Sequence, residues 1–249
     1  MQIYILGNGA MASAMAIGLK DKFEVIVVGR SEKKLENLAN LGFKTEIYGS
    51  SYDISNKNII LAFKPYALGD MAKILHGKAR ICISVLAMSN LEKLSVINSE
   101  KTCVCMPNIA AKFKSSVTPY FAEFDGKFDD EIYEILSTFG KAVRVENEKD
   151  MAIAGVLSGC APAFLAMVAE SLGNGGVKCG LKKEIASNLV SGVFESSAKL
   201  LENMHPSLLK ESVCSPAGTT IEGVLELEKH GIRSAFASAV VKSFEKSVK

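Results

Sequence analysis

The sequence predicts an α/β fold in which a doubly wound sheet is followed by an all-helical segment. As far as Asn147, short apolar runs alternate with segments of helical periodicity, and strands joined by helices pair in parallel. From Asp150 onward this alternation disappears, and stretches rich in alanine, leucine and serine replace it. The predicted boundary therefore divides residues 1–149 from residues 150–249.

The expected elements follow in order along the chain. Strands are predicted at residues 3–6, 24–28, 59–63, 79–85 and 102–106. Two further apolar runs, at 117–124 and 141–145, flank a predicted helix and extend the sheet at one edge. In the second half, helices are predicted over 161–173, 184–203 and 231–249. These helices are too apolar to stand alone, so we expect a second copy to cover them in a homodimer.

A glycine-rich turn joins the first predicted strand to the first predicted helix. Gly7 permits the tight bend, Gly9 leaves room for a pyrophosphate, and Ala12 lets the helix pack close to the sheet. Free N–H groups and the helix dipole at this N-terminus favour a diphosphate. The pattern therefore predicts a bound dinucleotide, held by the run Gly7-Asn8-Gly9-Ala10-Met11.

The end of the second predicted strand indicates which dinucleotide binds. Proteins that prefer NAD usually place an acidic residue here to hold the ribose 2′-hydroxyl. This chain instead has Arg30 and Ser31, followed by Lys33 and Lys34, and a guanidinium can hold a phosphate with two hydrogen bonds. Ser31 is also placed to cap the next helix, and the two roles are compatible. We therefore expect NADPH, with NADH as an alternative.

Two further turns follow predicted strands at the edge where ligands of doubly wound sheets bind. In Ala62-Phe63-Lys64-Pro65 the proline ends the strand, and the lysine can reach a phosphate or ribose of the cofactor. In Met106-Pro107-Asn108 the asparagine can hydrogen-bond the nicotinamide or the substrate, although turn formation explains the Pro-Asn pair equally well. We assign to the cofactor site Ala62, Lys64, Pro65 and Asn108, and place Asn108 in the substrate site too.

Two segments of small residues begin helices in the second half. Residues 157–163 lead into one helix with Pro162 in its first turn, and residues 215–220 open another. A turn of this kind presents several N–H groups to a carboxylate, although a capped helix start has the same pattern. No Ser-His-Asp, paired-carboxylate or Cys-His arrangement accompanies them. Hydride transfer needs none of these, because the cofactor carries the chemistry.

Composition narrows the remaining classes of function. The chain has 29 basic and 27 acidic residues, a balance that argues against nucleic acid or an anionic membrane as partner. We see no apolar stretch of membrane-spanning length and no signal peptide, and expect a cytoplasmic protein. The six cysteines form no C-x-x-C pair and the three histidines are scattered, so no metal site is predicted. Cys103 and Cys105 are expected to be buried thiols rather than a disulfide.

Taken together, these motifs resemble the pyrroline-5-carboxylate reductase family along essentially the whole chain. The most specific of them is Ser215-Pro216-Ala217-Gly218-Thr219-Thr220. The resemblance implies an NADP-binding Rossmann-type domain over 1–149 and a helical dimerisation and substrate domain over 150–249. It also implies NADPH-dependent reduction of the cyclic imine 1-pyrroline-5-carboxylate to L-proline, by a swapped dimer that often assembles into a ring of dimers.

The resemblance also implies roles for the residues of this loop. Ser215, Gly218 and Thr219 would bind the substrate carboxylate, and Thr220 would contact the ring nitrogen as the catalytic residue. The chain departs from the family pattern at Ile109, Cys160, Ala161 and Ala217, among other positions. If Ala217 adopts a positive φ, it carries strain of about 1 kcal/mol that glycine avoids.

Two alternatives remain open at this point. A β-hydroxyacid-type dehydrogenase would share the cofactor domain but would need a catalytic lysine in the second half. Four lysines are available, but none has a setting that singles it out: Lys178, Lys182, Lys183 and Lys199. A non-catalytic, NADPH-binding dimeric regulator is the other alternative, supported only by the substitutions in the loops.

Overall fold

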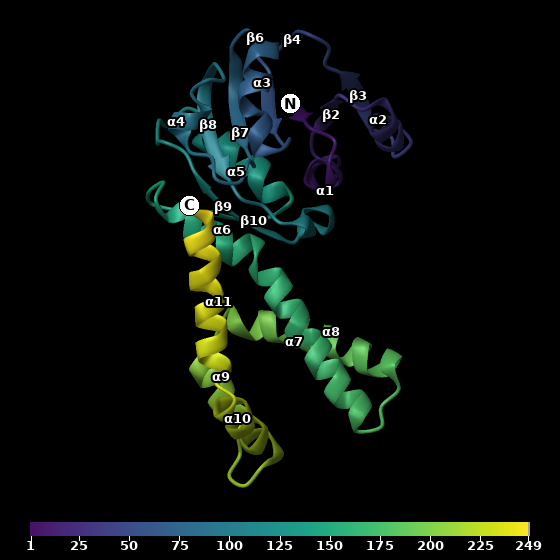
Figure 1. The fold of residues 1–249 in the computed structure, drawn as a ribbon, viewed down its shortest axis with the longest axis vertical. Coiled ribbons are helices and arrows are strands. Elements are labelled where there is room, and N and C mark those ends of the chain that lie inside the picture. Colours follow the sequence, from purple (N-terminus) through teal and green to yellow (C-terminus); the bar gives the residue numbers. More distant parts are fainter. Residues whose placement is uncertain (249) are drawn as a thin grey trace. The chain divides into compact units, whose positions relative to one another are not determined.

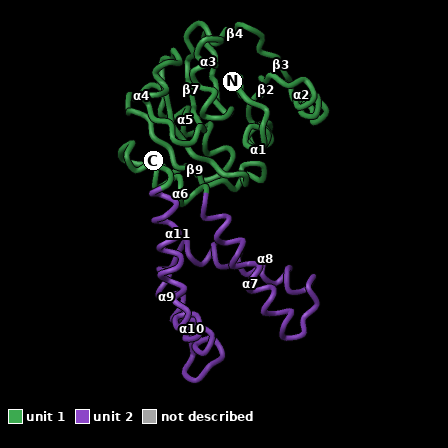
Figure 2. Tube along the Cα trace, viewed as in Figure 1, with its two compact units in different colours: residues 1–159, 246–249 green, residues 160–245 purple. Residues whose placement is uncertain are grey.

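The structure is a computed structural model that describes residues 1–248. It divides into two compact units (Figure 2). Unit 1 comprises Met1–Gly159 together with the C-terminal residues from Lys246, and unit 2 comprises Cys160–Glu245.

Unit 1 is built on an eight-stranded sheet with helices on both faces (Figure 1), which confirms the predicted doubly wound fold. Neighbouring strands are parallel except β8 and β9, which are antiparallel. The strands, in their order across the sheet, are β10 (Gly140–Arg144), β9 (Ser116–Phe121), β8 (Ser99–Cys105), β7 (Ala79–Ser84), β5 (Asn58–Leu61), β1 (Gln2–Leu6), β2 (Glu24–Gly29) and β3 (Lys44–Ile47).

The alternation of apolar side chains along these strands produces two buried clusters, one on each face of the sheet. Helices α1 (Ala10–Leu19), α2 (Glu32–Ala39) and α5 (Asp129–Thr138) contribute to one cluster. The other receives residues of α3 (Leu68–Ile74), α4 (Leu91–Leu94) and α6 (Asp150–Gly159). Short 3-10 turns, η1 (Pro65–Ala67) and η2 (Ile109–Phe113), follow β5 and β8.

Helix α1 packs unusually close to its surroundings at Gly18. A Cβ atom at this position would lie 2.4 Å from the Ala111 carbonyl oxygen in η2 and 2.7 Å from the Phe139 Cβ atom. No side chain fits at these distances, so the glycine is what allows η2 to lie against α1.

All seven predicted strands are present, and β9 and β10 extend the sheet at one edge as expected. The sequence analysis missed β3, a polar strand at the opposite edge with mostly exposed residues. It also missed β4 (Tyr52–Asp53) and β6 (Leu75–His76), which form a separate two-residue pairing. Edge and very short strands bury little apolar surface, so they lack the pattern that predicts a strand.

Three cysteines lie in the core of unit 1 as free thiols: Cys82, Cys103 and Cys105. This confirms the expectation for Cys103 and Cys105. Burial disfavours the thiolate and raises the pKa of Cys82 to about 12. Since the thiolate is the reactive form, these side chains act as small apolar groups and not as nucleophiles.

Helix α6 belongs to unit 1 and packs on the sheet, whereas the helices that follow it form unit 2. Met151 is buried in the second cluster, and the Ser158 hydroxyl donates to the Met106 carbonyl at 3.0 Å. The compact units therefore divide after residue 159, ten residues beyond the predicted boundary. The boundary at 149/150 stays a prediction.

Residues Asp150–Lys178 correct one expectation of the sequence analysis. This stretch is long and apolar enough to cross a membrane by length and composition. The expectation that no such stretch exists was wrong, because the chain carries no charge from Met151 to Ala169. In the structure it is divided at Cys160 into α6 and α7 (Ala161–Lys178).

Unit 2 consists of helices with almost no core of their own. Besides α7 it contains α8 (Lys183–Leu201), α9 (Pro206–Ser212), α10 (Thr219–Lys229) and most of α11 (Ile232–Ser247). Among its residues, which are all described, the one buried hydrophobic side chain is Ala186, at 3% exposure. Large apolar side chains such as Met167, Leu189 and Leu225 are more than half exposed. Surface of this kind requires a partner.

Candidate active site

The turn after β1 is shaped by two glycines with different functions. Gly7 has a φ of 140°, and a Cβ atom there would lie 2.4 Å from the Ala62 carbonyl oxygen at the end of β5. Its N–H donates to the Val28 carbonyl at 2.7 Å, which ties the turn to β2. A Cβ atom at Gly9 would meet nothing within 4 Å. Gly7 is therefore required by the fold, whereas Gly9 borders open space.

This open space lies at the N-terminus of α1. Gly9 is the N-cap of the helix and has no side chain to satisfy the free N–H groups of the first turn, Ala10 and Met11 among them. Ala12 is fully buried and allows the helix to pack on the sheet. A diphosphate fits this cradle, because unpaired N–H groups and the positive end of the helix dipole face the same empty region.

The residues after β2 leave polar groups available beside this cradle. Asn8 Nδ2 donates to the Ser31 carbonyl at 3.3 Å, which connects the turn after β1 to the turn after β2. Ser31 occupies the N-cap of α2, but its hydroxyl makes no capping hydrogen bond, and Arg30 is exposed. Among the described residues neither this hydroxyl nor the Arg30 guanidinium has a hydrogen-bond partner. Both groups suit a phosphate on the ribose, so the donors present fit NADP.

The turn after β5 adjoins the same cradle. The Ala62 N–H donates to the Leu6 carbonyl at 2.9 Å, and Pro65 begins η1 directly after Lys64. The Lys64 side chain is exposed, and within residues 1–248 its ammonium group has no hydrogen bond or ion pair. It is thus free to reach an anionic ligand.

Asn108 is held by hydrogen bonds on three sides. It is the N-cap of η2, where its Oδ1 accepts from the Ala110 N–H at 3.0 Å, so the turn-forming role is confirmed. Its Nδ2 donates to the Ser158 carbonyl at 3.0 Å, and its backbone N–H donates to Ser116 Oγ at 3.0 Å. A role in binding the nicotinamide or the substrate stays a prediction.

The predicted substrate loop lies in unit 2 and opens helix α10. The Gly218 N–H donates to the Ser215 carbonyl at 3.0 Å, and a Cβ atom at Gly218 would lie 2.3 Å from Ser215 Oγ. Thr219 and Thr220 form the exposed first turn, and the N-cap Gly218 provides no side-chain hydrogen bond. Ala217 has a φ of 56°, the left-handed conformation that the sequence analysis considered. The loop thus presents the Thr219 and Thr220 hydroxyls together with the N–H groups at the N-terminus of α10.

The loops of unit 1 therefore bring the predicted cofactor residues together at the carboxyl ends of three adjacent strands, β5, β1 and β2. Asn108 follows β8, which is two strands beyond β5. Ser158 and Ser116, which hold Asn108, were not among the predicted site residues. Ser158 lies in the motif 157–163, but nothing in the sequence pairs it with a residue fifty positions earlier.

Comparison with known proteins decides the family. The pyrroline-5-carboxylate reductase of Helicobacter pylori (strain J99) is 36% identical to this chain, over 98% of each sequence. The corresponding reductase of Synechocystis is 31% identical, over 99% of this chain and 97% of the relative. This chain belongs to the pyrroline-5-carboxylate reductase family.

Solved structures of the reductase family have the same fold. The reductase of Streptococcus pyogenes aligns with a TM-score of 0.86 at 28% identity, over 100% of this chain and 98% of that one. The reductase of Plasmodium falciparum, solved with NADP bound, aligns with a TM-score of 0.83 at 27% identity, with the same coverage.

Family profiles match the two halves of the chain separately. Residues 148–249 match the family described as pyrroline-5-carboxylate reductase dimerisation. Residues 2–88 match the family described as NADP oxidoreductase, coenzyme F420-dependent. The region matched by the dimerisation family contains the whole of unit 2, whose helices lack a core, so self-association explains their exposed apolar side chains.

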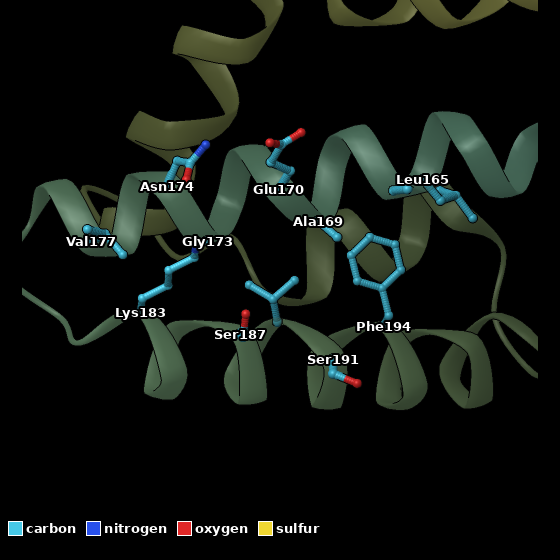
Figure 3. A pocket seen from close by; sticks show the side chains of 12 residues that line it. Leu165, Ala169, Glu170, Gly173, Asn174, Val177, Lys183, Ser187, Ser191 and Phe194 are labelled. Atoms are coloured by element: carbon cyan, nitrogen blue, oxygen red, sulfur yellow. The ribbon is translucent and has the colours of Figure 1, made fainter.

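A groove of about 540 Å³ between α7 and α8 contains none of the predicted site residues (Figure 3). Phe194 and Lys183 reach from α8 toward α7, where Leu165 and Ala169 lie. The lining is largely apolar and lies within the region matched by the reductase dimerisation family. Of the four lysines considered for a hydroxyacid dehydrogenase, Lys183 borders this groove and Lys199 pairs with Glu195 at 2.8 Å.

Proposed function

We propose that this protein reduces 1-pyrroline-5-carboxylate to L-proline with NADPH. The observation that carries the proposal is the cradle at the N-terminus of α1, in a chain that matches reductases of this name along its whole length. Open space over Gly9 and the N–H groups at the start of α1 would receive the diphosphate, and the Arg30 and Ser31 side chains would receive the 2′-phosphate. When bound, NADPH would supply the hydride that the imine carbon accepts.

The loop at the start of α10 would hold the substrate. We propose that Ser215, Gly218 and Thr219 receive the carboxylate through hydroxyl and backbone N–H groups, which are oriented by the helix end. Thr220, in the same first turn, would hydrogen-bond the ring nitrogen and orient it for protonation. A protonated imine is the better hydride acceptor, so a donor placed at this nitrogen accelerates the reaction.

We also propose where and in what form the protein works. The cytoplasm supplies NADPH, and the reductase would work there as a homodimer, or as a ring of dimers built from it. The native mass of the purified protein, measured by light scattering, distinguishes a dimer from a larger ring.

The proposed activity is tested by initial rates of NADPH and NADH oxidation, with and without 1-pyrroline-5-carboxylate. We expect imine-dependent oxidation that is faster with NADPH, and proline as the product. Binding of NADPH without turnover would instead favour a non-catalytic regulator. Turnover with a panel of 3-hydroxyacids and NADP⁺, but not with the imine, would favour the dehydrogenase.

A further inference from the structure

Ser158 connects the last turn of α6 to the loop that follows β8. Its side chain is buried, at 5% exposure, although serine is usually found at the surface. Its hydroxyl donates to the Met106 carbonyl at 3.0 Å, and its own carbonyl accepts from Asn108 Nδ2 at 3.0 Å. Gly155, one turn earlier, lets Met106 approach, since a Cβ atom there would lie 3.3 Å from Met106 Cγ. Two hydrogen bonds and one close contact therefore fix this loop.

These contacts also determine which way the Asn108 amide points. Oδ1 must face the Ala110 N–H and Nδ2 must face the Ser158 carbonyl, because the reversed amide would place like groups together at both ends. The backbone of Asn108 is anchored independently by Ser116, which is fully buried and also hydrogen-bonded to Thr118. Of the two N–H groups on Nδ2, one is used by Ser158. Within residues 1–248 the second N–H has no acceptor, so Asn108 can act as a donor to a ligand.

The strand order indicates which part of the cofactor this donor serves. Arg30 and Ser31 follow β2 on one side of β1, and the diphosphate cradle follows β1 itself. The loops after β5, β7 and β8 lie on the other side of β1. A dinucleotide whose 2′-phosphate lies by β2 therefore extends its nicotinamide toward the loop that contains Asn108.

We propose that Ser158 is a positioning residue, which holds Asn108 so that its remaining N–H donates to the carboxamide oxygen of the nicotinamide. The proposal rests on the proposed function only in taking NADP(H) as the cofactor. Ser158 itself touches no ligand and acts through the Met106–Asn108 loop. Without its hydroxyl, the end of α6 and this loop lose one of the two hydrogen bonds that join them.

The test compares two ligands that differ only in the nicotinamide riboside end: NADP⁺ and 2′-phospho-ADP-ribose. Calorimetric titration of Ser158→Ala is expected to show NADP⁺ binding weakened about tenfold, the effect of one hydrogen bond. Binding of 2′-phospho-ADP-ribose is expected to be unchanged. Ser99→Ala is the matched control, because Ser99 is a hydrogen-bonded, half-buried serine at the opposite end of β8.

Two results would overturn the proposal: unchanged NADP⁺ binding in Ser158→Ala, or equal weakening of both ligands. If Ser158→Ala does not fold, Ser158→Cys replaces it, because a thiol is a weaker hydrogen-bond donor to the Met106 carbonyl than the hydroxyl and fills the site better than alanine. The same selective loss of NADP⁺ binding is then expected, and an equal loss of both ligands contradicts the proposal. Binding needs no imine, so a protein that binds NADP⁺ but does not reduce the imine would refute the proposed function alone.

Discussion

The role proposed for Thr220 can be tested apart from the roles of the other residues in the loop 215–220. Gly218 and Thr219 also offer backbone N–H groups, which most side-chain substitutions leave in place, whereas the role proposed for Thr220 depends on its hydroxyl alone. Thr220→Ala is therefore expected to lower kcat by about a hundredfold while the KM for NADPH changes little. Steady-state kinetics at saturating imine measure this, and Thr220→Ser, which keeps the hydroxyl, is the matched control. Equal activity in Thr220→Ala would remove the residue from the mechanism.

Ala217 tests backbone strain in the same loop. Its φ of 56° destabilises the folded state by about 1–2 kcal/mol for a residue with a Cβ atom. Glycine avoids this strain, but it also makes the unfolded chain more flexible, which offsets about 0.4–1 kcal/mol of the gain. Ala217→Gly is thus expected to stabilise the protein by about 0.5–1 kcal/mol, measured by urea unfolding at constant protein concentration. The control Ala198→Gly lies within α8 and should destabilise by about 1 kcal/mol. Destabilisation by Ala217→Gly would show that the strain estimate is wrong.

Helix α1 is constrained differently at its two ends. At Gly18 an added methyl group would meet the Ala111 carbonyl, so Gly18→Ala is expected to destabilise the fold by about 1–3 kcal/mol. At Gly9 the space is empty, so Gly9→Ala is expected to change stability by less than about 1 kcal/mol while weakening NADPH binding at least tenfold.

Urea unfolding and NADPH titration of both variants check this pair, and each variant is the control for the other. The reverse outcome, with Gly9→Ala unfolded and Gly18→Ala defective only in binding, would show that the fold requires Gly9 and the ligand requires Gly18.

The elements also show how far the sequence could predict this molecule. The buried strands were predictable because their apolar runs are dictated by the two-sided core, and the glycine turn because its backbone geometry needs those residues. The polar edge strand β3 has no such pattern. The attachment of α6 to the sheet depends on Met151 and Ser158 meeting residues far away in the sequence. Hydrophobic periodicity describes one segment at a time, so it could not reveal these contacts or the hydrogen bonds that Ser158 and Ser116 make to Asn108.

At the scale of the whole molecule, the helices of unit 2 depend on a second copy. Ile185, Leu189 and Val193 form an exposed stripe along α8 at intervals of four residues, and the groove toward α7 adds a second apolar face. Helices that bury one hydrophobic residue cannot offset the entropy of ordering them. Their stability therefore depends on protein concentration.

Leu189→Glu is expected to shift the protein toward single chains and to abolish turnover, since the charge would be buried in the subunit contact. Leu189 is 57% exposed in one chain, so the substitution leaves the isolated helix undisturbed. Sedimentation velocity measures the mass, and Leu189→Met, which preserves volume and polarity, serves as the control. A fully active Leu189→Glu variant with the parental mass would place the contact on other surfaces.

The close approach of Gly18 to η2 has a consequence for the evolution of such chains. Gly9 and Gly18 lie in one short segment, yet under the proposed function Gly9 is constrained by the cofactor, whereas Gly18 is constrained by the Ala111 carbonyl oxygen. A descendant that abandons its cofactor is free to lose Gly9 at once, whereas Gly18 can change only after η2 has moved away. In relatives that have lost the catalytic activity, we therefore expect a glycine at the position of Gly18 more often than at the position of Gly9.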